Sequence, residues 1–297
     1  MSNAAGEHML NKYIFVALRT KHWLKNFIIF LPLIFGRQLF VFPANLKTIA
    51  AFFLFSLTAS SVYLINDVID IEKDKAHPSK RLRPIPSNKI GIDQAVMTAS
   101  ILAAISMTCS FLLNVHLGYL LLIYFGLNFL YMIIFKDLVI LDVFCLGGFF
   151  LLRIIVGSTV AGVGLSHWII IMTALLALFL GFNKRRQELR LLGEQASQHR
   201  HVFTKYNLHF IDQMTAIITS SIVIAYMLYT VDVRTVGQFG TRDLLYSIPF
   251  VYYGIFRYLY LIHKNEGEGD PTQILLSDRM LQLNIILWLI VCTAIIY

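Results

Sequence analysis

Asn66-Asp67-Val68-Ile69-Asp70-Ile71-Glu72-Lys73-Asp74 is the stretch from which the rest of this sequence is best understood. It follows a long apolar run, residues 49–65, where a cluster of carboxylates is costly unless it serves a function. At about 100° per residue on a helix, Asp67, Asp70 and Asp74 lie within an arc of roughly 60°. The spacing therefore predicts three carboxylates on one helical face.

Three neighbouring carboxylates repel one another unless a cation joins them, and hard oxygen ligands of this kind suit Mg²⁺. Asn66 can assist them, whereas Glu72 points away from the trio. Mg²⁺ keeps several waters and is usually completed by substrate phosphates, so the cluster indicates a diphosphate site. The alternative is a solvated acidic helix end. The basic loop that follows favours the diphosphate site; it contains Lys80, Arg81 and Arg83 and ends in Pro84-Ile85-Pro86.

The composition excludes a soluble domain. Of the 297 residues, 57% are hydrophobic and only 14% are charged, and the mean hydropathy is +0.68. A soluble fold could not keep so much apolar surface from water, so we expect an integral membrane protein. Ser2-Asn3-Ala4 looks like the remnant of an expression tag. We expect residues 1–25 to hold this remnant and an interfacial segment, and residues 26–297 to form a single polytopic transmembrane domain.

Nine apolar segments each approach the ~20 residues that a bilayer crossing requires. With the N-terminus inside, 20 of the 25 Lys and Arg residues fall on the inner side and four on the outer side. This asymmetry predicts a multi-pass protein of the cell membrane with its N-terminus and acidic motif in the cytoplasm. Anionic lipids or phosphorylated substrates explain the net charge of +8 without nucleic acid. The predicted spans are 27–42, 46–66, 93–113, 117–135, 139–161, 167–183, 210–231, 244–262 and 280–297.

The acidic motif, in this setting, resembles the first aspartate-rich motif of the UbiA superfamily of intramembrane prenyltransferases. The nine spans and the Arg83-Pro84-Ile85-Pro86 element resemble that superfamily as well, so the resemblance covers nearly the whole chain. It implies an all-α helical bundle with its active site at the cytoplasmic face. It also implies that Asp67, Asp70 and Asp74 hold Mg²⁺ on a diphosphate.

Within the superfamily, three stretches resemble the decaprenyl-phosphate phosphoribosyltransferases, which transfer phosphoribose from phosphoribosyl diphosphate (PRPP) to a polyprenyl phosphate. The first is Arg19 to Asn26, where Lys21, Lys25 and Asn26 either contact phosphate or anchor the chain at the interface beside Trp23. The other two are Lys136-Asp137-x-x-Ile140-Leu141-Asp142 with Gly148-Phe149-x-Leu151-x-Arg153, and Asn183-Lys184-Arg185-Arg186-Gln187-Glu188-Leu189.

Asp142 and Arg153 fall within predicted hydrocarbon, where charged side chains usually face a cavity or each other. They are eleven residues apart, about three helical turns, so they can share a face without touching. Together with Lys136 and Asp137 they either contact substrate or have a structural role, and the sequence leaves both readings open.

The third stretch departs from the aromatic prenyltransferases, which have a second aspartate-rich motif at this place. Here it holds Lys184, Arg185 and Arg186, with Glu188 as the nearest carboxylate. Such cations would bind further phosphates directly, for example the 5-phosphate of PRPP or the phosphate of the lipid. The alternative is a topological role, with a Lys184–Glu188 pair one turn apart.

The predicted reaction is Mg²⁺-dependent transfer of 5-phosphoribose from PRPP to a polyprenyl phosphate, for furanose precursors of envelope glycans. The predicted catalytic residues are Asp67, Asp70, Asp74 and Lys184. One alternative is an aromatic prenyltransferase that uses a prenyl diphosphate donor, and another is a lipid-binding protein or transporter without enzymatic activity. The oligomeric state is left open, a homo-oligomer included.

Overall fold

The computed structural model describes residues 12–192, 205–264 and 271–297, and α-helices and short 3-10 helices are the regular elements in these ranges. An all-helical fold is what an apolar chain of this kind requires. Inside lipid, every backbone N–H and C=O must find a partner within the protein, and a helix supplies these partners locally. The predicted all-α class is therefore confirmed.

Among the described residues, seven helices are long and apolar enough to cross a membrane. The predicted spans 27–42 and 244–262 are not single long helices of this kind. The first is a 3-10 helix, η1 (Thr20–Phe30), followed by α2 (Leu31–Phe35), and the second is η6 (Asp243–Ser247) followed by the 17-residue α12 (Ile248–Lys264). The seven long helices are α3 (Ala44–Ile69), α5 (Ile92–Leu113), α6 (Val115–Ile133), α7 (Leu141–Ala161), α8 (His167–Leu192), α10 (Leu208–Val231) and α14 (Arg279–Ile296).

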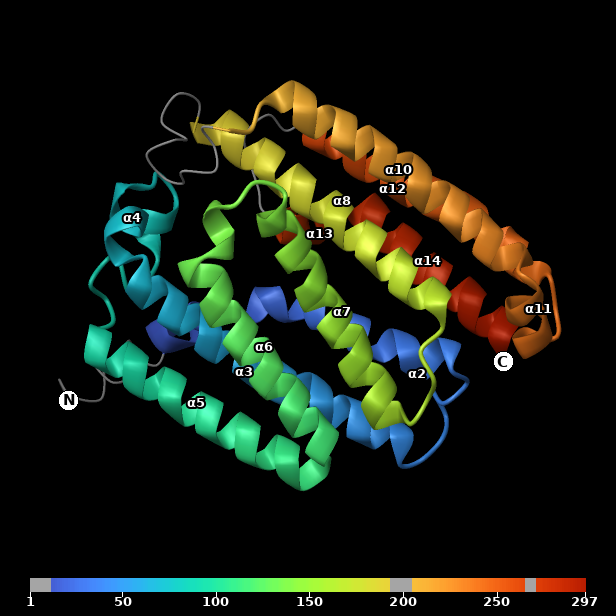
Figure 1. Cartoon of the computed structure of the whole chain (residues 1–297), viewed down its shortest axis with the longest axis horizontal. Coiled ribbons are helices and arrows are strands. Elements are labelled where there is room, and N and C mark those ends of the chain that lie inside the picture. Colours follow the sequence, from blue (N-terminus) through green and yellow to red (C-terminus); the bar gives the residue numbers. More distant parts are fainter. Residues whose placement is uncertain (1–11, 193–204, 265–270) are drawn as a thin grey trace.

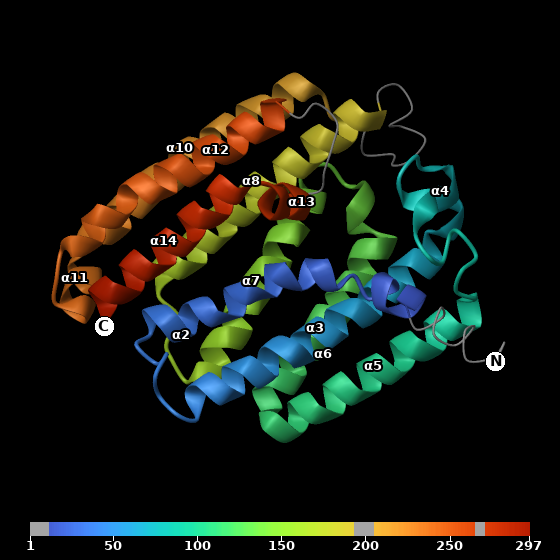
Figure 2. The same ribbon diagram turned by 180° about the vertical axis from the view of Figure 1, so that it is seen from behind.

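The remaining elements are short and lie near the ends of the long helices. The helix α4 and the C-terminal end of α8 lie at one end of the bundle, and α2, α11 and the C-terminus lie toward the other end (Figures 1 and 2). The acidic motif and the basic segment of α8 are thus at the same end. The short elements are α4 (Ile71–Ala76), η2 (Lys80–Leu82), η3 (Phe135–Asp137), α11 (Val233–Phe239) and α13 (Pro271–Ser277).

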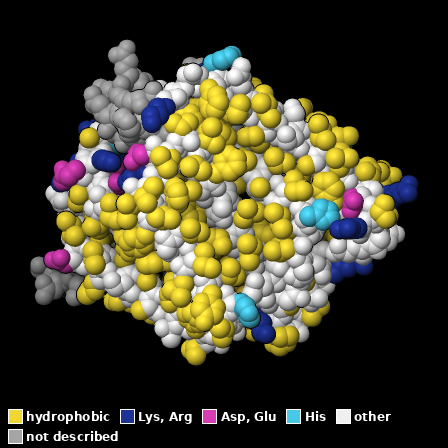
Figure 3. All heavy atoms as spheres, in the orientation of Figure 1, with side chains coloured by type: hydrophobic (Ala, Val, Ile, Leu, Met, Phe, Trp, Pro, Cys, Tyr) yellow, Lys and Arg dark blue, Asp and Glu magenta, His cyan; other side chains and the backbone are white. Residues whose placement is uncertain are grey.

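Hydrophobic side chains cover most of the molecular face shown in Figure 3, and the charged side chains gather toward its two sides. Large apolar residues point outward from several helices; Leu112, for example, is 82% exposed and Ile133 is 72% exposed. Exposing so much apolar surface to water would be unfavourable, whereas contact with lipid tails is not. The surface and the seven apolar helices make the protein a multi-pass membrane protein.

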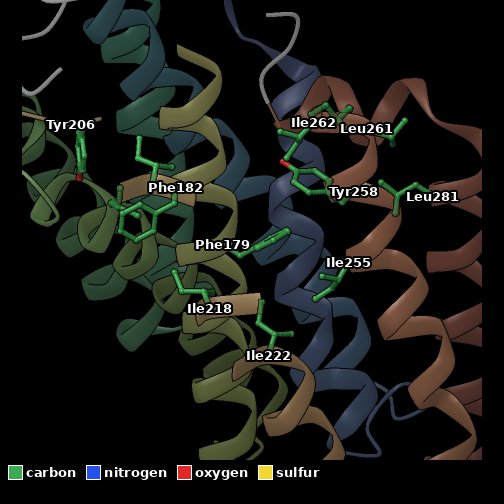
Figure 4. Close-up of a cluster of buried hydrophobic side chains, with 13 residues drawn as sticks. Phe179, Phe182, Tyr206, Ile218, Ile222, Ile255, Tyr258, Leu261, Ile262 and Leu281 are labelled. Carbon is green, nitrogen blue, oxygen red and sulfur yellow. The ribbon is translucent and has the colours of Figure 1, made fainter. Parts of the chain in front are cut away.

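Two buried hydrophobic clusters hold the bundle together. One joins α8, α10, α12 and α14 through residues such as Phe179, Ile222, Ile255 and Leu281 (Figure 4). The other joins α3, α6 and α7 and includes Phe55, which is fully buried. Because lipid is as apolar as these side chains, the helices associate mainly through close van der Waals packing.

A glycine determines how closely η1 crosses α7. A Cβ atom at Gly157 would lie 2.1 Å from the carbonyl oxygen of Ile29, so only glycine permits this approach. The crossing brings η1 beside α7 deep within the bundle, where Arg153 Nε donates a hydrogen bond to Asn26 Oδ1 at 2.7 Å.

The orientation of the bundle in the membrane is a prediction from charge asymmetry, and labelling can test it. The three cysteines that the structure describes are free thiols, so they can be replaced before single cysteines are introduced. We expect cysteines at Asn88 and Arg190 to react with a membrane-impermeant maleimide only from the cytoplasmic side, and a cysteine at Gln238 only from outside. Labelling of positions 88 and 190 from opposite sides would contradict a single site at one membrane face.

Candidate active site

The acidic motif does not form one regular helix. Helix α3 ends at Ile69, Asp70 has φ −95° and ψ 16°, and α4 begins at Ile71. The expected helical face of Asp67, Asp70 and Asp74 is therefore interrupted at Asp70. Asp70 pairs with a different cation from the other two carboxylates.

Asp67 and Asp74 converge on one guanidinium group. Arg83 Nη1 lies 3.0 Å from Asp67 Oδ1 and 2.6 Å from Asp74 Oδ2. Arg19 Nη2 donates a further hydrogen bond to Asp67 Oδ1. The two carboxylate side chains are only 2% and 6% exposed, so these cations offset a desolvation cost that unpaired carboxylates could not bear.

Asp70 has its own partner, because Lys136 Nζ lies 3.0 Å from its Oδ1. Lys136 belongs to η3, the turn between α6 and α7, so this pair ties the acidic motif to another part of the bundle. Asn66 is half-buried, and its carbonyl oxygen accepts a hydrogen bond from the Asp70 N–H. Glu72 points away from the three aspartates, as predicted. It is exposed and pairs with Lys75.

The described residues contain no group of three His, Cys, Asp or Glu side chains arranged to hold a metal ion. The predicted three-carboxylate metal site therefore stays a prediction. Two carboxylates do converge on a point that a cation already occupies, and their oxygens are the donors that Mg²⁺ prefers. The residues therefore fit a divalent ion at the Asp67–Asp74 pair, provided that Arg83 gives up its position there.

The loop that carries Arg83 is anchored by its apolar residues. Ile85 is 1% exposed and packs with Leu64 and Ala17, and the flanking prolines are buried. Ser87 Oγ also donates a hydrogen bond to the Arg83 carbonyl oxygen at 2.6 Å. Burial, and next the charge of Arg19, lower the pKa of Arg83. In the same loop, Lys80 is half-buried and Arg81 is exposed.

Helix α8 continues to Leu192, nine residues beyond the predicted end of its span, so the basic segment is helical. Arg185 is fully buried and lies at the centre of an ion-pair network. Its Nε lies 2.5 Å from Asp142 Oδ2, and its Nη1 lies 2.5 Å from Glu188 Oε2. These bonds give Arg185, Asp142 and Glu188 partners within the protein, and their predicted role as substrate contacts stays a prediction. Along the helix, Glu188 pairs with Arg185, three residues earlier.

Two tyrosines complete this network. Arg185 Nη2 donates to Tyr131 Oη at 3.1 Å, and Tyr206 Oη donates to Asp142 Oδ1 at 2.8 Å. Tyr206 Oη also accepts the N–H of Ile140, a residue with a φ of 70° at the start of α7. The network thus fixes the turn before α7, the end of α8 and the chain before α10 as one unit.

The other cations of the basic segment differ in exposure. Arg186 is 2% exposed, and its Nε lies 2.6 Å from Asp212 Oδ1 on α10. The structure thus gives Arg186 a protein partner where a phosphate contact was predicted. Lys184 is half-buried in the C-terminal part of α8. Of the three predicted phosphate-binding cations on α8, Lys184 is therefore the best placed.

Arg153 and Asn26 also have structural partners. Arg153 is 4% exposed, donates to the Phe149 carbonyl oxygen at 2.7 Å, and lies over the ring of Phe55 at 4.8 Å. Asn26 Nδ2 donates to Ser56 Oγ at 2.9 Å. As expected, Asp142 and Arg153 pair with other residues rather than with each other, and these partners favour the structural reading. Lys21 is exposed, and Lys25 and Asp137 are half-buried.

Sequence reasoning missed three partners of the site. Arg19 begins the first of the stretches that carry the family resemblance, but the sequence did not assign it to the carboxylate that it contacts. Tyr206 and Asp212 lie outside every motif, so no local pattern marked them. Only its position could have marked Asp212. A carboxylate close to an apolar segment is costly unless a cation pairs with it.

A cavity of about 690 Å³ lies within the bundle, and none of the predicted site residues lines it. Its walls are mostly apolar and come from α2, α8, α10, α12 and α14. At one end the lining includes Ile28, two residues from Asn26, and Leu180, one turn from Lys184. The cavity therefore reaches from the opposite half of the bundle to within about a turn of the charged end.

These features define the class of protein: a multi-pass membrane transferase with a charged site at one end of a helical bundle. The chain belongs to the UbiA prenyltransferase family, whose model matches residues 27–285. It superposes on a solved UbiA homologue from Archaeoglobus fulgidus bound to GPP and Mg²⁺ with a TM-score of 0.70, covering 96% of this chain and 99% of that chain at 16% identity. At that identity the superposition establishes the shared fold.

Similar full-length proteins include two decaprenyl-phosphate phosphoribosyltransferases. The protein from Mycolicibacterium smegmatis is 29% identical over 290 residues, which cover 95% of this chain and 91% of that protein. The protein from Corynebacterium glutamicum is 29% identical over 286 residues, covering 95% of this chain and 86% of that protein. A digeranylgeranylglyceryl phosphate synthase from Sulfurisphaera tokodaii is 39% identical over 71 residues, 24% of this chain.

Proposed function

We propose that the protein transfers 5-phosphoribose from PRPP to a polyprenyl phosphate and releases diphosphate. The observation that carries this proposal is that residues 183–190 on α8 hold no second carboxylate motif, so this segment does not offer the ligands of a second metal ion. Residues 183–190 contain four cations and one carboxylate, and that carboxylate, Glu188, pairs with Arg185. A substrate with phosphates beyond its diphosphate suits such a place better than a second metal does. The names of the relatives that match 95% of the chain support the same reading.

The charged end of the bundle provides the groups that this substrate needs. Asp67, Asp70 and Asp74, assisted by Asn66, would hold Mg²⁺ on the diphosphate, where the ion neutralises the leaving group. Cations would hold the phosphates and stabilise the charge that develops as diphosphate departs. Those that we assign to this role are Lys21, Lys25, Lys80, Arg81, Arg83, Lys136 and Lys184.

The chemistry requires no protein nucleophile. An oxygen of the lipid phosphate, already an anion, attacks C1 of the ribose while the bond from C1 to the diphosphate oxygen breaks. The electron pair of that bond leaves with the diphosphate. The work of the protein is to hold donor and acceptor in line, because correct placement of two reactants supplies much of the rate enhancement.

The apolar cavity is the proposed place for the lipid chain. Its lining includes Leu31 and Phe35 near the N-terminus and Ile285 and Trp288 on α14. A polyprenyl chain can occupy such walls while its phosphate lies near Lys184 at the charged end. The product, a 5-phosphoribosyl-1-phosphoryl-polyprenol, would serve as a precursor of furanose sugars in envelope glycans. We place the charged end and the N-terminus on the cytoplasmic side of the cell membrane, because most Lys and Arg residues lie there.

The rival activity is transfer of a prenyl group to an aromatic acceptor. We consider it because the chain shares its fold with a homologue bound to GPP. Purified protein should be given labelled PRPP with polyprenyl phosphate, and separately prenyl diphosphate with 4-hydroxybenzoate. We expect a lipid-soluble phosphoribosyl product in the first reaction and no product in the second. Prenylated 4-hydroxybenzoate without phosphoribosyl lipid would reject the proposal, and no product in either reaction would favour a lipid-binding or transport role.

A further inference from the structure

We propose that Arg83 is an internal counter-ion that holds the Asp67–Asp74 pair closed to a divalent cation until a diphosphate binds. The inference rests on the proposed diphosphate substrate and adds an order of binding: the metal enters with the diphosphate and not before it. Arg83 then exchanges its carboxylate partners for phosphate oxygens.

The geometry makes the two cations mutually exclusive. Arg83 Nη1 is 3.0 Å from Asp67 Oδ1 and 2.6 Å from Asp74 Oδ2, so it fills the space between the two oxygens. Mg²⁺ binds carboxylate oxygens at about 2.0–2.1 Å. An ion bound to both oxygens would compete with this nitrogen for the same carboxylate oxygens, so Arg83 must release them when the ion binds.

The charges explain why a diphosphate is needed for this exchange. Asp67 and Asp74 are balanced by Arg19 and Arg83, so the buried pair is already neutral. Adding a divalent cation alone would leave two uncompensated positive charges in a place that water barely reaches. A diphosphate supplies the missing negative charge and offers Arg83 a bidentate partner, which guanidinium groups bind well.

The structure allows Arg83 to move while its surroundings stay fixed. Its side chain is 28% exposed, whereas the carboxylate side chains are 2% and 6% exposed. The backbone of the loop is held by Ile85, which is 1% exposed in its own apolar cluster. Only the arginine side chain needs to swing, because the loop and the two aspartates are already packed.

Two binding measurements on the full-length protein in lipid nanodiscs test this exchange. The first titrates Mn²⁺ alone and follows free Mn²⁺ by electron paramagnetic resonance. The second measures binding of ³²P-labelled inorganic diphosphate by equilibrium dialysis, with and without Mn²⁺. The variants are Arg83→Gln and, as a matched control, Lys73→Gln. Lys73 carries the same charge beside Asp74 but is exposed on α4.

For Arg83→Gln we expect Mn²⁺ alone to bind at least about tenfold more tightly than in the wild type, and diphosphate with Mn²⁺ to bind about tenfold more weakly. Because coupling between two ligands is reciprocal, the effect of Mn²⁺ on diphosphate binding must shrink in the same variant. Lys73→Gln should stay within about twofold of the wild type in both measurements.

Unchanged or weaker Mn²⁺ binding by Arg83→Gln, or an equal gain in Lys73→Gln, would overturn the proposal. If Arg83→Gln does not fold, Arg83→Lys provides the test, because its single ammonium cannot bridge both carboxylates in the same way and should tighten Mn²⁺ binding by about threefold; no gain there also overturns it. Neither measurement uses PRPP or lipid. Failure of the proposed reaction and failure of the Arg83 exchange are therefore seen separately.

Discussion

Replacing Asp67 with Asn is expected to lower the rate of phosphoribosyl transfer by at least about a hundredfold. Asn keeps the shape of the side chain but removes the negative charge that a divalent ion and Arg83 both require. The loss of one charged contact in a buried site typically costs about 1.5–3 kcal/mol, and Asp67 takes part in more than one. Asp70→Asn should have a similar effect, and so should the removal of divalent metal from the wild type with EDTA. The measurement is the initial rate with saturating PRPP and polyprenyl phosphate.

Asp93→Asn is the matched control, since Asp93 is exposed in the first turn of α5 and should tolerate the change with full activity. The Asp67 and Asp70 variants should still insert and elute as folded protein. Appreciable activity of the wild type in EDTA would end the metal hypothesis. Full activity of Asp67→Asn would remove Asp67 from the site.

Arg185→Gln is expected to destabilise the protein by about 3–5 kcal/mol, because it leaves a buried carboxylate without its cation. Asp142 and Arg185 are fully buried 2.5 Å apart, and the same guanidinium holds Glu188 and Tyr131. We expect a large fall in thermal stability and in the yield of folded protein from membranes. Thermal unfolding in detergent, followed by intrinsic fluorescence, measures the change.

Lys184→Gln is the neighbouring comparison. Lys184 is half-buried at the charged end, so its substitution should weaken use of PRPP by roughly ten- to a hundredfold with little loss of stability. The double variant Asp142→Asn with Arg185→Gln should recover part of the stability that Arg185→Gln loses. If Arg185→Gln is as stable as the wild type and loses PRPP use as Lys184→Gln does, Arg185 binds substrate and its ion pairs are secondary.

Because the protein's own cations neutralise the carboxylates, its folding should not depend on metal. Each aspartate of the motif contacts a cation, from Arg19, Arg83 or Lys136. The charged end can therefore fold without metal, unlike a site whose carboxylates would otherwise repel one another. The wild type should keep its folded stability in EDTA even where its activity is lost, which separates a catalytic from a structural role for the ion.

The membrane class, the all-helical fold and most span positions could be predicted from the sequence, because each depends on local composition. Residues 95–113, for example, carry no charged side chain, and the helix there begins within one residue of the predicted span. The acidic motif could be recognised for a similar reason, since carboxylates after an apolar run are costly wherever the chain places them. The extension of α8 to Leu192 was missed because polar residues end a hydropathy signal without ending a helix.

The sequence by itself determined that this protein crosses the membrane as helices and that carboxylates and cations meet near one face. It could not determine which cation pairs with which carboxylate. Arg19 and Asp67 are 48 positions apart, and Arg185 and Asp142 are 43 apart, so only the crossing of helices brings them together. The tertiary structure therefore decided that Arg185 pairs with Asp142 and that Arg83 contacts two aspartates. The physical reason is that a charge in a buried site takes the partner that packing places within about 3 Å, whatever its distance along the chain.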